Sequence, residues 1–430
     1  MILDRTIQPR IRKMEDFEIQ SPDHRVLKNG MDMYVITAGT EDVIRFDLVI
    51  EGGQWDQQKP LQALFTNRML REGSQNFTSC EIAEKLDYYG AWLDLSSSVK
   101  HGFITLYSLS KCFEQTLAIL ADMIKHPTFP EKELRIVTNT NKQQFIVNSE
   151  KVDTLARKQL NVSLFGENHP LGHFATCDDF EKICTSDLKQ FHQKYYSSSN
   201  STIYVSGRVT EKILKEIELQ LGDESWGQTN VTNDTTLYTP QPIQEKSIFI
   251  EKADALQSSL KMGMLFVDRN HQDYLKSRVL VTLLGGYFGS RLMSNIREDK
   301  GYTYGIGAGI VSFPNLSALV ISSEADNTNI RPMITEVYKE IDRLRNERVS
   351  QEELEMVKNY MLGDFSRAYE GALSIADAWI YVQTAGVDFD FFNRSLRAIN
   401  EVTSEELLDL AQKYLRKEEI REVVAGKRVD

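Results

Sequence analysis

The sequence predicts an α+β protein of two homologous domains, each a mostly antiparallel sheet with helices on one face, which face each other as a clamshell. The first observation is a repeat within the 430 residues. At an offset of 220 (354 − 134 = 220), four residues find their own type again: Leu134, Val137, Asn139 and Phe145 recur as Leu354, Val357, Asn359 and Phe365. A two-copy repeat of this length indicates a duplicated domain. The second observation is that strand patterns mix with long helical patterns, which favours layers of sheet and helix.

The domain boundaries follow from composition. We expect a first domain at residues 1–227, a linker at 228–246 and a second domain at 247–430. The linker is rich in Thr, Asn and Gln, and strand patterns at 202–205 and 247–250 flank it. Each domain of roughly 200 residues is long enough to bury its own core.

Within each half, a strand leads into an amphipathic helix, as apolar residues spaced three and four apart indicate. The expected strand–helix pairs are 44–50 with 61–70, and 261–266 with 274–284. Another helix carries an apolar stripe that we interpret as core packing: Phe113, Leu117, Leu120 and Ile124. That helix ends before Pro127, because proline cannot continue it.

Charge and hydropathy exclude some classes of partner. The net charge of −12 argues against nucleic acid, whose recognition needs clustered Lys and Arg. No apolar run approaches about 18 residues, so we expect no membrane partner. Residues 1–20 contain no apolar signal segment, and we therefore expect an unexported, cytoplasmic protein.

Residues 63–74 read Ala-Leu-Phe-Thr-Asn-Arg-Met-Leu-Arg-Glu-Gly-Ser and follow a predicted strand and Gly-rich turn. This segment resembles the inverted-zinc-motif metallopeptidases, the family of pitrilysin, insulin-degrading enzyme and mitochondrial processing peptidase. In that family the helix reads A-H-x-x-E-H-M-L before Gly-Thr or Gly-Ser. Further segments that resemble the family are 24–30, 81–91, 126–130, 164–172 and 290–304. The resemblance covers nearly the whole chain and implies the duplicated clamshell fold.

The chain departs from this family where zinc would bind. The resemblance implies two His four residues apart on one helix face, a Glu as general base, and a carboxylate from a later helix. Carried over, the two His fall on Leu64 and Arg68, the Glu on Asn67, and the third ligand on Gln144, or on Gln143 if the gap shifts by one. Leucine has no lone pair, arginine is a cation, and asparagine cannot take a proton from water. We therefore predict no metal on this chain and no hydrolysis by the chain alone.

A metal site elsewhere would need other histidines. Of the seven, only His169 and His173 lie four residues apart, and Pro170 and Gly172 between them disfavour a helical pair. This alternative is therefore much the weaker one.

The second half retains another part of the family's machinery. The resemblance implies an Arg, and a Tyr seven residues later, that reach the scissile carbonyl, and Arg297 and Tyr304 have this spacing (304 − 297 = 7). A guanidinium and a phenol can both donate hydrogen bonds to an oxyanion. Tyr302 is the alternative if the turn differs in register. The competing interpretation is a surface arginine at a helix end and a tyrosine packed on a strand.

Two segments are candidates for contact with a peptide. The glycines at 301, 305, 307 and 309 lead into a strand pattern, so they are not a dinucleotide fingerprint. They either let an extended peptide approach the backbone or mark a bulged strand. Residues 91–97 resemble the family's edge strand, to which a substrate adds as a further strand. There we expect Leu93 and Leu95 to contact substrate through main-chain hydrogen bonds, a mode that tolerates many peptide sequences.

These features predict a non-catalytic subunit of a two-chain peptidase. A homologous partner would carry zinc on an intact H-x-x-E-H helix, while this chain needs no cofactor. Arg297 and Tyr304 would act on an extended peptide in a shared chamber. A non-enzymatic scaffold subunit and a stand-alone peptide-binding protein are the alternatives.

Overall fold

A computed structural model describes residues 20–228 and 238–429. Residues 229–237 of the predicted linker lie outside the described residues, as does the segment 1–19 on which the expectation of an unexported chain depends. Within the described ranges, no helix is long and apolar enough to cross a membrane.

Two sheets with the same strand order form the framework. The first contains β1 (Asp23–Val26), β2 (Asp32–Thr37), β3 (Val43–Glu51), β4 (Trp92–Ser97), β5 (His101–Leu109) and β6 (Ser201–Gly207), ordered β1-β2-β6-β3-β5-β4. The second contains β7 (Ser247–Glu251), β8 (Gln257–Phe266), β9 (Thr303–Phe313), β10 (Leu316–Asp326) and β11 (Arg421–Gly426), ordered β7-β11-β8-β10-β9. The two orders coincide from β2 and β7 onward. The pairs β2–β6 and β7–β11 are parallel, and every later pair of neighbouring strands in the two orders is antiparallel.

The helices follow the same duplication. Those of the first half are α1 (Gln62–Arg68), α2 (Ser79–Tyr88), α3 (Phe113–Lys125), α4 (Glu131–Ser149), α5 (Val152–Phe165), α6 (Asp179–Lys182), α7 (Thr185–Tyr195) and α8 (Glu211–Ile217). Those of the second half are α9 (Tyr274–Val281), α10 (Ile330–Asn346), α11 (Gln351–Ala368), α12 (Ala372–Ala385), α13 (Phe391–Glu401) and α14 (Ser404–Tyr414). The α+β prediction of two homologous layered domains is confirmed. The stripe on α3 is buried in the core, as expected.

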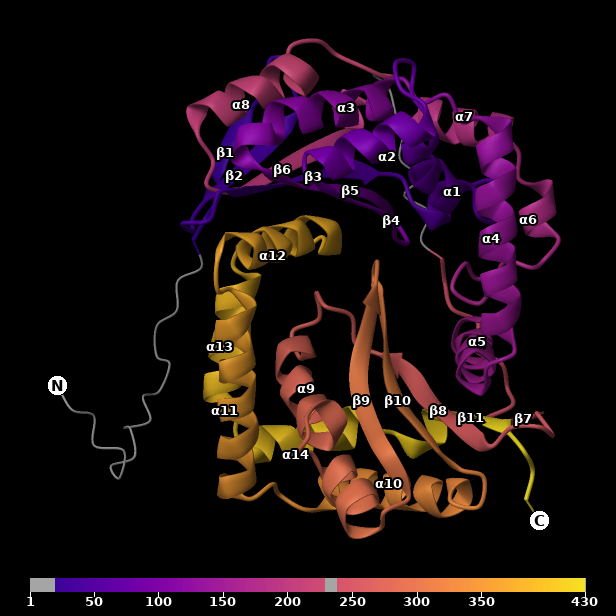
Figure 1. Ribbon diagram of the computed structural model, residues 1–430. Helices are drawn as coiled ribbons and strands as arrows, with labels where there is room; N and C mark the ends of the chain where they lie inside the picture. The colour runs from indigo at the N-terminus through magenta and orange to yellow at the C-terminus, as the bar shows by residue number, and fades with distance from the viewer. Residues whose placement is uncertain (1–19, 229–237, 430) are drawn as a thin grey trace, which may run out of the picture.

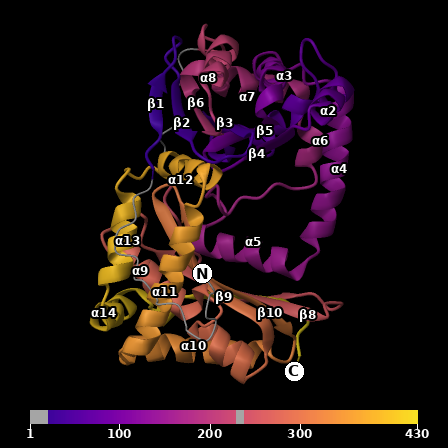
Figure 2. The same ribbon diagram turned by 60° about the vertical axis from the view of Figure 1, so that its left-hand side comes forward.

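The two halves exchange helices across the clamshell. Figure 1 shows α2, α3 and α8 above the first sheet, with α12 of the second half beneath it. There Trp379 and Ala376 of α12 pack against Val49 and Tyr204. Reciprocally, α5 of the first half packs its apolar face on the second sheet (Figure 2). Since α5 and α12 occupy the same place in the repeat (152 + 220 = 372), each half covers part of the inner face of the other.

One partly buried histidine of this framework, His192, predicts a loss of stability in acid. Burial lowers the pKa of His192 on α7 to about 4. The carbonyl oxygen of Ile124, which lies 2.8 Å from Nε2, acts in the opposite direction and raises this pKa. The folded-state pKa is below the unfolded value of about 6.5, so the stabilisation is present above pH 6.5 and is lost as the pH falls towards 4. We expect His192→Gln to remove about 2 kcal/mol of the stability loss between pH 7 and pH 5, measured by urea unfolding. The exposed His173→Gln serves as control, and an equal change of slope in both variants would contradict the prediction.

Candidate functional site

The helix at the family's zinc position is tied to the edge of the first sheet by an amide. Asn67 on α1 is buried, and its Nδ2 donates to the carbonyl oxygens of Ser96 at 2.7 Å and Phe103 at 3.3 Å. Its Oδ1 is buried without a hydrogen-bond partner. Asn67 therefore holds α1 against β4 and β5 at the place where the family would have a general base.

Leucine, arginine and glutamine side chains occupy the positions of the three metal ligands, at Leu64, Arg68 and Gln144 (or Gln143). Arg68 donates from Nη1 to Oδ1 of Asn141 on α4, and Leu64 lies beside it on the same helix face, half-buried. Burial and the charge of Arg71 lower the pKa of Arg68, but a guanidinium stays protonated near neutral pH. Gln143 and Gln144 are exposed on α4. Sequence analysis missed Asn141, although it lies only one helical turn before Gln144.

This donor set does not fit a zinc ion, because zinc needs thiolate, imidazole or carboxylate ligands. Across residues 20–228 and 238–429, no group of three His, Cys, Asp or Glu side chains is arranged to hold a metal. His169 and His173 lie in the loop after α5. The His169 ring accepts a hydrogen bond from the Leu171 amide at 3.0 Å through Nδ1 and stacks on Phe165, as a core residue does.

Arg297 and Tyr304 lie together in the second half. Arg297 is in a π-helical turn, Met293–Asp299, and its guanidinium carbon lies 5.3 Å from the Tyr304 ring centroid and 4.7 Å from that of Phe288. Tyr304 is 91% exposed, so its hydroxyl is accessible to a ligand. Tyr302 instead packs against the domain core. The geometry therefore pairs Arg297 with Tyr304 and not with Tyr302.

A β-bulge directs Tyr304 outward. Ser323 of β10 pairs with Ile306, but Ala325 pairs with Thr303, so β9 contains one extra residue at this point. The Thr303 hydroxyl donates to the Glu324 carbonyl at 2.6 Å, and the Ser323 hydroxyl donates to the Gly305 carbonyl at 2.9 Å. These buried hydroxyls hold the bulge in place. The bulged-strand interpretation of the glycine run is thus correct at its beginning, and bulges commonly redirect a side chain in this way.

The rest of the glycine run leaves room beside the strand. A Cβ added to Gly305 or Gly309 would meet no other atom within 4 Å, and at Gly307 it would meet only the Gly285 carbonyl, at 3.6 Å. The chain's own packing therefore does not require glycine on this face of β9. Because β9 is the edge strand of its sheet, an extended peptide could approach it there.

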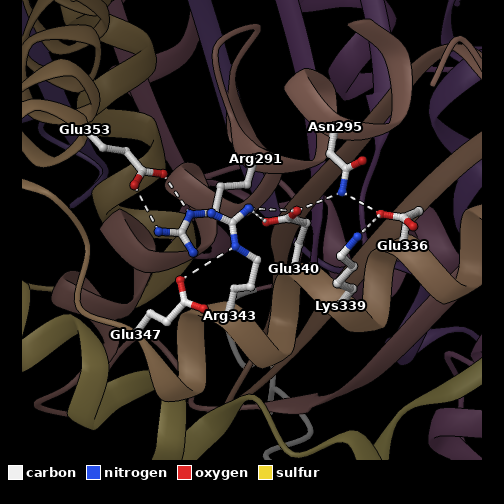
Figure 3. Close-up of polar contacts among 8 residues, drawn as sticks. All are labelled: Arg291, Asn295, Glu336, Lys339, Glu340, Arg343, Glu347 and Glu353. Atoms are coloured by element: carbon white, nitrogen blue, oxygen red, sulfur yellow. Dashed lines mark hydrogen bonds and ion pairs between the residues drawn. The ribbon is translucent and has the colours of Figure 1, made fainter. Parts of the chain in front are cut away.

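A charged network anchors the turn that carries Arg297 (Figure 3). Arg291 makes a bidentate pair with Glu353 of α11, at 2.8 and 2.9 Å. Asn295 donates to Glu336 at 2.8 Å and to Glu340 at 2.7 Å, both on α10. Two helices thus fix the segment just before Arg297, which limits the movement of its guanidinium.

The other predicted peptide contact lies on β4, the edge strand of the first sheet. The side chains of Leu93 and Leu95 are each 8% exposed and face the core, so they are not available to a substrate, and the expected main-chain contact stays a prediction. The alternation of a strand places Trp92, which is 67% exposed, on the open face instead. Arg71 already donates to the Leu93 carbonyl at 2.7 Å. Only main-chain groups of the two leucines could meet a peptide.

A cavity of about 750 Å³ opens between the halves. The first half lines it with Trp55, Lys100 and His101, and the second half with Phe313 and Tyr381. A chamber of this size between two domains is a usual setting for a ligand.

Comparisons with known proteins agree with this architecture. Residues 35–176 match the family described as Insulinase (Peptidase family M16), and residues 182–361 match the Peptidase M16 inactive domain. The chain is 25% identical to the uncharacterized zinc protease YmxG of Bacillus subtilis over 72% of this chain and 75% of that protein. It is 24% identical to the non-peptidase homolog YmxG of Helicobacter pylori over 83% and 82%.

Two further likenesses concern a processing peptidase and a crystal structure. The chain is 28% identical to the mitochondrial-processing peptidase subunit alpha-1 of Dictyostelium discoideum over 46% of this chain and 31% of that protein. The crystal structure of a peptidase M16 inactive domain from Pseudomonas fluorescens has a TM-score of 0.82 at 23% identity, covering 95% of this chain and 98% of that one.

Proposed function

The chain belongs to the insulinase family of peptidases, M16, and we propose that it is a non-catalytic subunit of a two-chain zinc peptidase. One observation carries this proposal. Leu64, Asn67 and Arg68 replace the metal-binding and general-base residues, whereas Arg297 and Tyr304 are kept together in a rigid and accessible setting. A chain that only filled space in a complex would need neither an exposed phenol nor a guanidinium beside it.

In this proposal each chain supplies half of the chemistry. A homologous partner with an intact H-x-x-E-H helix would hold the zinc, which would supply an activated water when bound. The peptide lies extended, bound through main-chain groups along an edge strand. Arg297 and Tyr304 donate hydrogen bonds to the oxygen that gains charge as water attacks the scissile carbonyl. Because Phe288 and Tyr304 flank the guanidinium, it is held in position before the reaction begins.

Reconstitution tests the proposal. We expect this chain, co-expressed with a homologue that carries H-x-x-E-H, to purify as a stable complex that contains zinc and hydrolyses a fluorescence-quenched peptide. Either chain alone should be inactive, and a chelator should stop turnover by the complex. Chelator-sensitive hydrolysis by this chain alone would refute the proposal. A stable complex without turnover would favour the scaffold alternative.

The open face of β9 supplies a separate prediction. Gly309→Val is expected to change the free energy of unfolding by no more than about 0.5 kcal/mol, since Gly309 is exposed and an added Cβ meets no other atom within 4 Å. It should nevertheless weaken binding of an extended peptide by roughly tenfold, about 1.4 kcal/mol, by blocking approach to the strand. Urea unfolding and fluorescence anisotropy measure the two quantities. The control is Gly363→Ala on α11, where the added Cβ also meets no other atom within 4 Å and β9 is left unaltered. Equal peptide affinity of the two variants would place the peptide elsewhere.

A further inference from the structure

A second cavity, of about 520 Å³, lies beside the far end of β9 from Tyr304. The helices α9, α11, α12 and α13 surround it, and Figure 1 shows these helices together on one side of β9. Its polar lining includes Arg269, Tyr274, Arg278, Ser312, Tyr369 and Tyr381. It contains two cations and several phenols, and neither the metal position nor the Arg297 site includes any of them.

The two arginines of this cavity have no counter-ion among residues 20–228 and 238–429. Among the residues the structure describes, no carboxylate lies within ion-pair distance of Arg269 or Arg278. Asp377 is the one carboxylate in the lining, and it already pairs with Arg45, with 2.7 Å between Oδ1 and Nη2. The Arg269 Nε is buried without a hydrogen-bond partner. A buried donor left unsatisfied on a charged group is costly, so an external acceptor would relieve it.

The neighbouring phenols add neutral donors. The Arg269 guanidinium carbon lies 5.4 Å from the ring centroid of Tyr381. Burial raises the pKa of Tyr381, and the positive charges of Arg269 and Arg278 partly oppose this rise. Both guanidinium groups therefore interact electrostatically with the Tyr381 hydroxyl. Burial likewise raises the pKa of Tyr369. Both phenols therefore stay protonated near neutral pH, and Tyr381 can donate to an anion.

We propose that this cavity binds a carboxylate of the peptide, either its C-terminus or an acidic side chain, an inference that rests on the proposed function. Guanidinium groups match carboxylates because two parallel N–H groups meet two oxygens. Arg269, Ser312 and Tyr381 also line the larger cavity between the halves, so the carboxylate site joins the chamber. Tyr304 and Ser312 are eight residues apart on β9 (312 − 304 = 8), or about 26 Å of strand. An extended oligopeptide could span that distance.

Three decapeptides of one sequence, each with an N-terminal fluorescein, test the site by anisotropy with the purified full chain. One ends in a free carboxylate, one in an amide, and one in an amide after a final glutamate. We expect at least one carboxylate-bearing peptide to bind about tenfold or more tightly than the plain amide. A preference for the free acid alone identifies the C-terminus as the ligand, and equally tight binding of the glutamate amide identifies an acidic side chain. Because the chain carries a charge of −12, long-range attraction cannot produce either preference.

Variants separate the site from the rest of the chain. Arg269→Gln with Arg278→Gln should lower the affinity of the preferred peptide to that of the plain amide while leaving amide binding unchanged, which also shows that the variant folds. The control Arg331→Gln, at an exposed arginine of α10, should have no effect. Equal binding of all three peptides would overturn the carboxylate site but not the proposed function. Failure of all three to bind, both to this chain and to its complex with the zinc-bearing partner, would overturn the peptide-binding function as well.

Discussion

Replacement of Arg297 by alanine in the assembled two-chain peptidase is expected to lower kcat/KM by roughly 100- to 200-fold, with complex formation unchanged. The physical reason is that loss of one donor to the developing oxyanion costs about 3 kcal/mol. Arg297 is a strong candidate donor because Phe288 and Tyr304 sandwich its guanidinium and the network at Arg291 fixes the preceding turn. Steady-state kinetics with a quenched peptide, and size-exclusion chromatography of the complex, provide the two readouts.

Two conservative variants sharpen this test. Tyr304→Phe removes only the hydroxyl, so we expect a comparable loss of kcat with little change in KM if that hydroxyl acts in the transition state. Tyr302→Phe, on the neighbouring residue packed against the core, should retain full activity. Unchanged turnover in both the Arg297 and Tyr304 variants would support the scaffold alternative.

Replacement of Arg45 by methionine is expected to destabilise the protein by about 3–5 kcal/mol, because it leaves a buried charge without its partner. Arg45 on β3 is 7% exposed and Asp47 is 3% exposed, with 2.9 Å between Nε and Oδ2. Burial raises the pKa of Asp47, and Arg45 acts against that rise. Arg45 also pairs with Asp377 of α12, so the variant should loosen the contact between the halves.

Urea unfolding measures this loss, and two further variants test its cause. Arg208→Met breaks a short pair with Asp42 at the surface, 2.6 Å in length, and should cost no more than about 1 kcal/mol. The double variant Arg45→Met with Asp47→Leu should recover most of the lost stability, because no buried charge remains unpaired and Asp377, at 66% exposure, is solvated. If the double variant is as unstable as Arg45→Met alone, the ion pair is not the source of the effect.

The sequence by itself determined the duplication and the nature of the altered metal position. Leu134 and Leu354 open equivalent helices, α4 and α11, because the same apolar spacing must bury the same face of each helix. The chemistry of Leu64, Asn67 and Arg68 could likewise be read directly, since whether a side chain can bind a metal is a property of the residue itself. The spacing of Arg297 and Tyr304 was also visible, but spacing alone cannot bring two side chains together.

Only the tertiary structure decided how these parts meet. An apolar helix face does not specify which sheet will cover it, so neither the exchange of α5 and α12 nor the contact between Arg68 and Asn141 could be read from periodicity. The register of β4 turns the Leu93 side chain into the core, so only its main-chain groups face a possible peptide, which the local pattern did not specify. Tyr304 faces outward because a bulge opposite Ser323 shifts the alternation of β9 by one residue. Each of these outcomes depends on contacts between residues far apart in the chain, which local pattern does not encode.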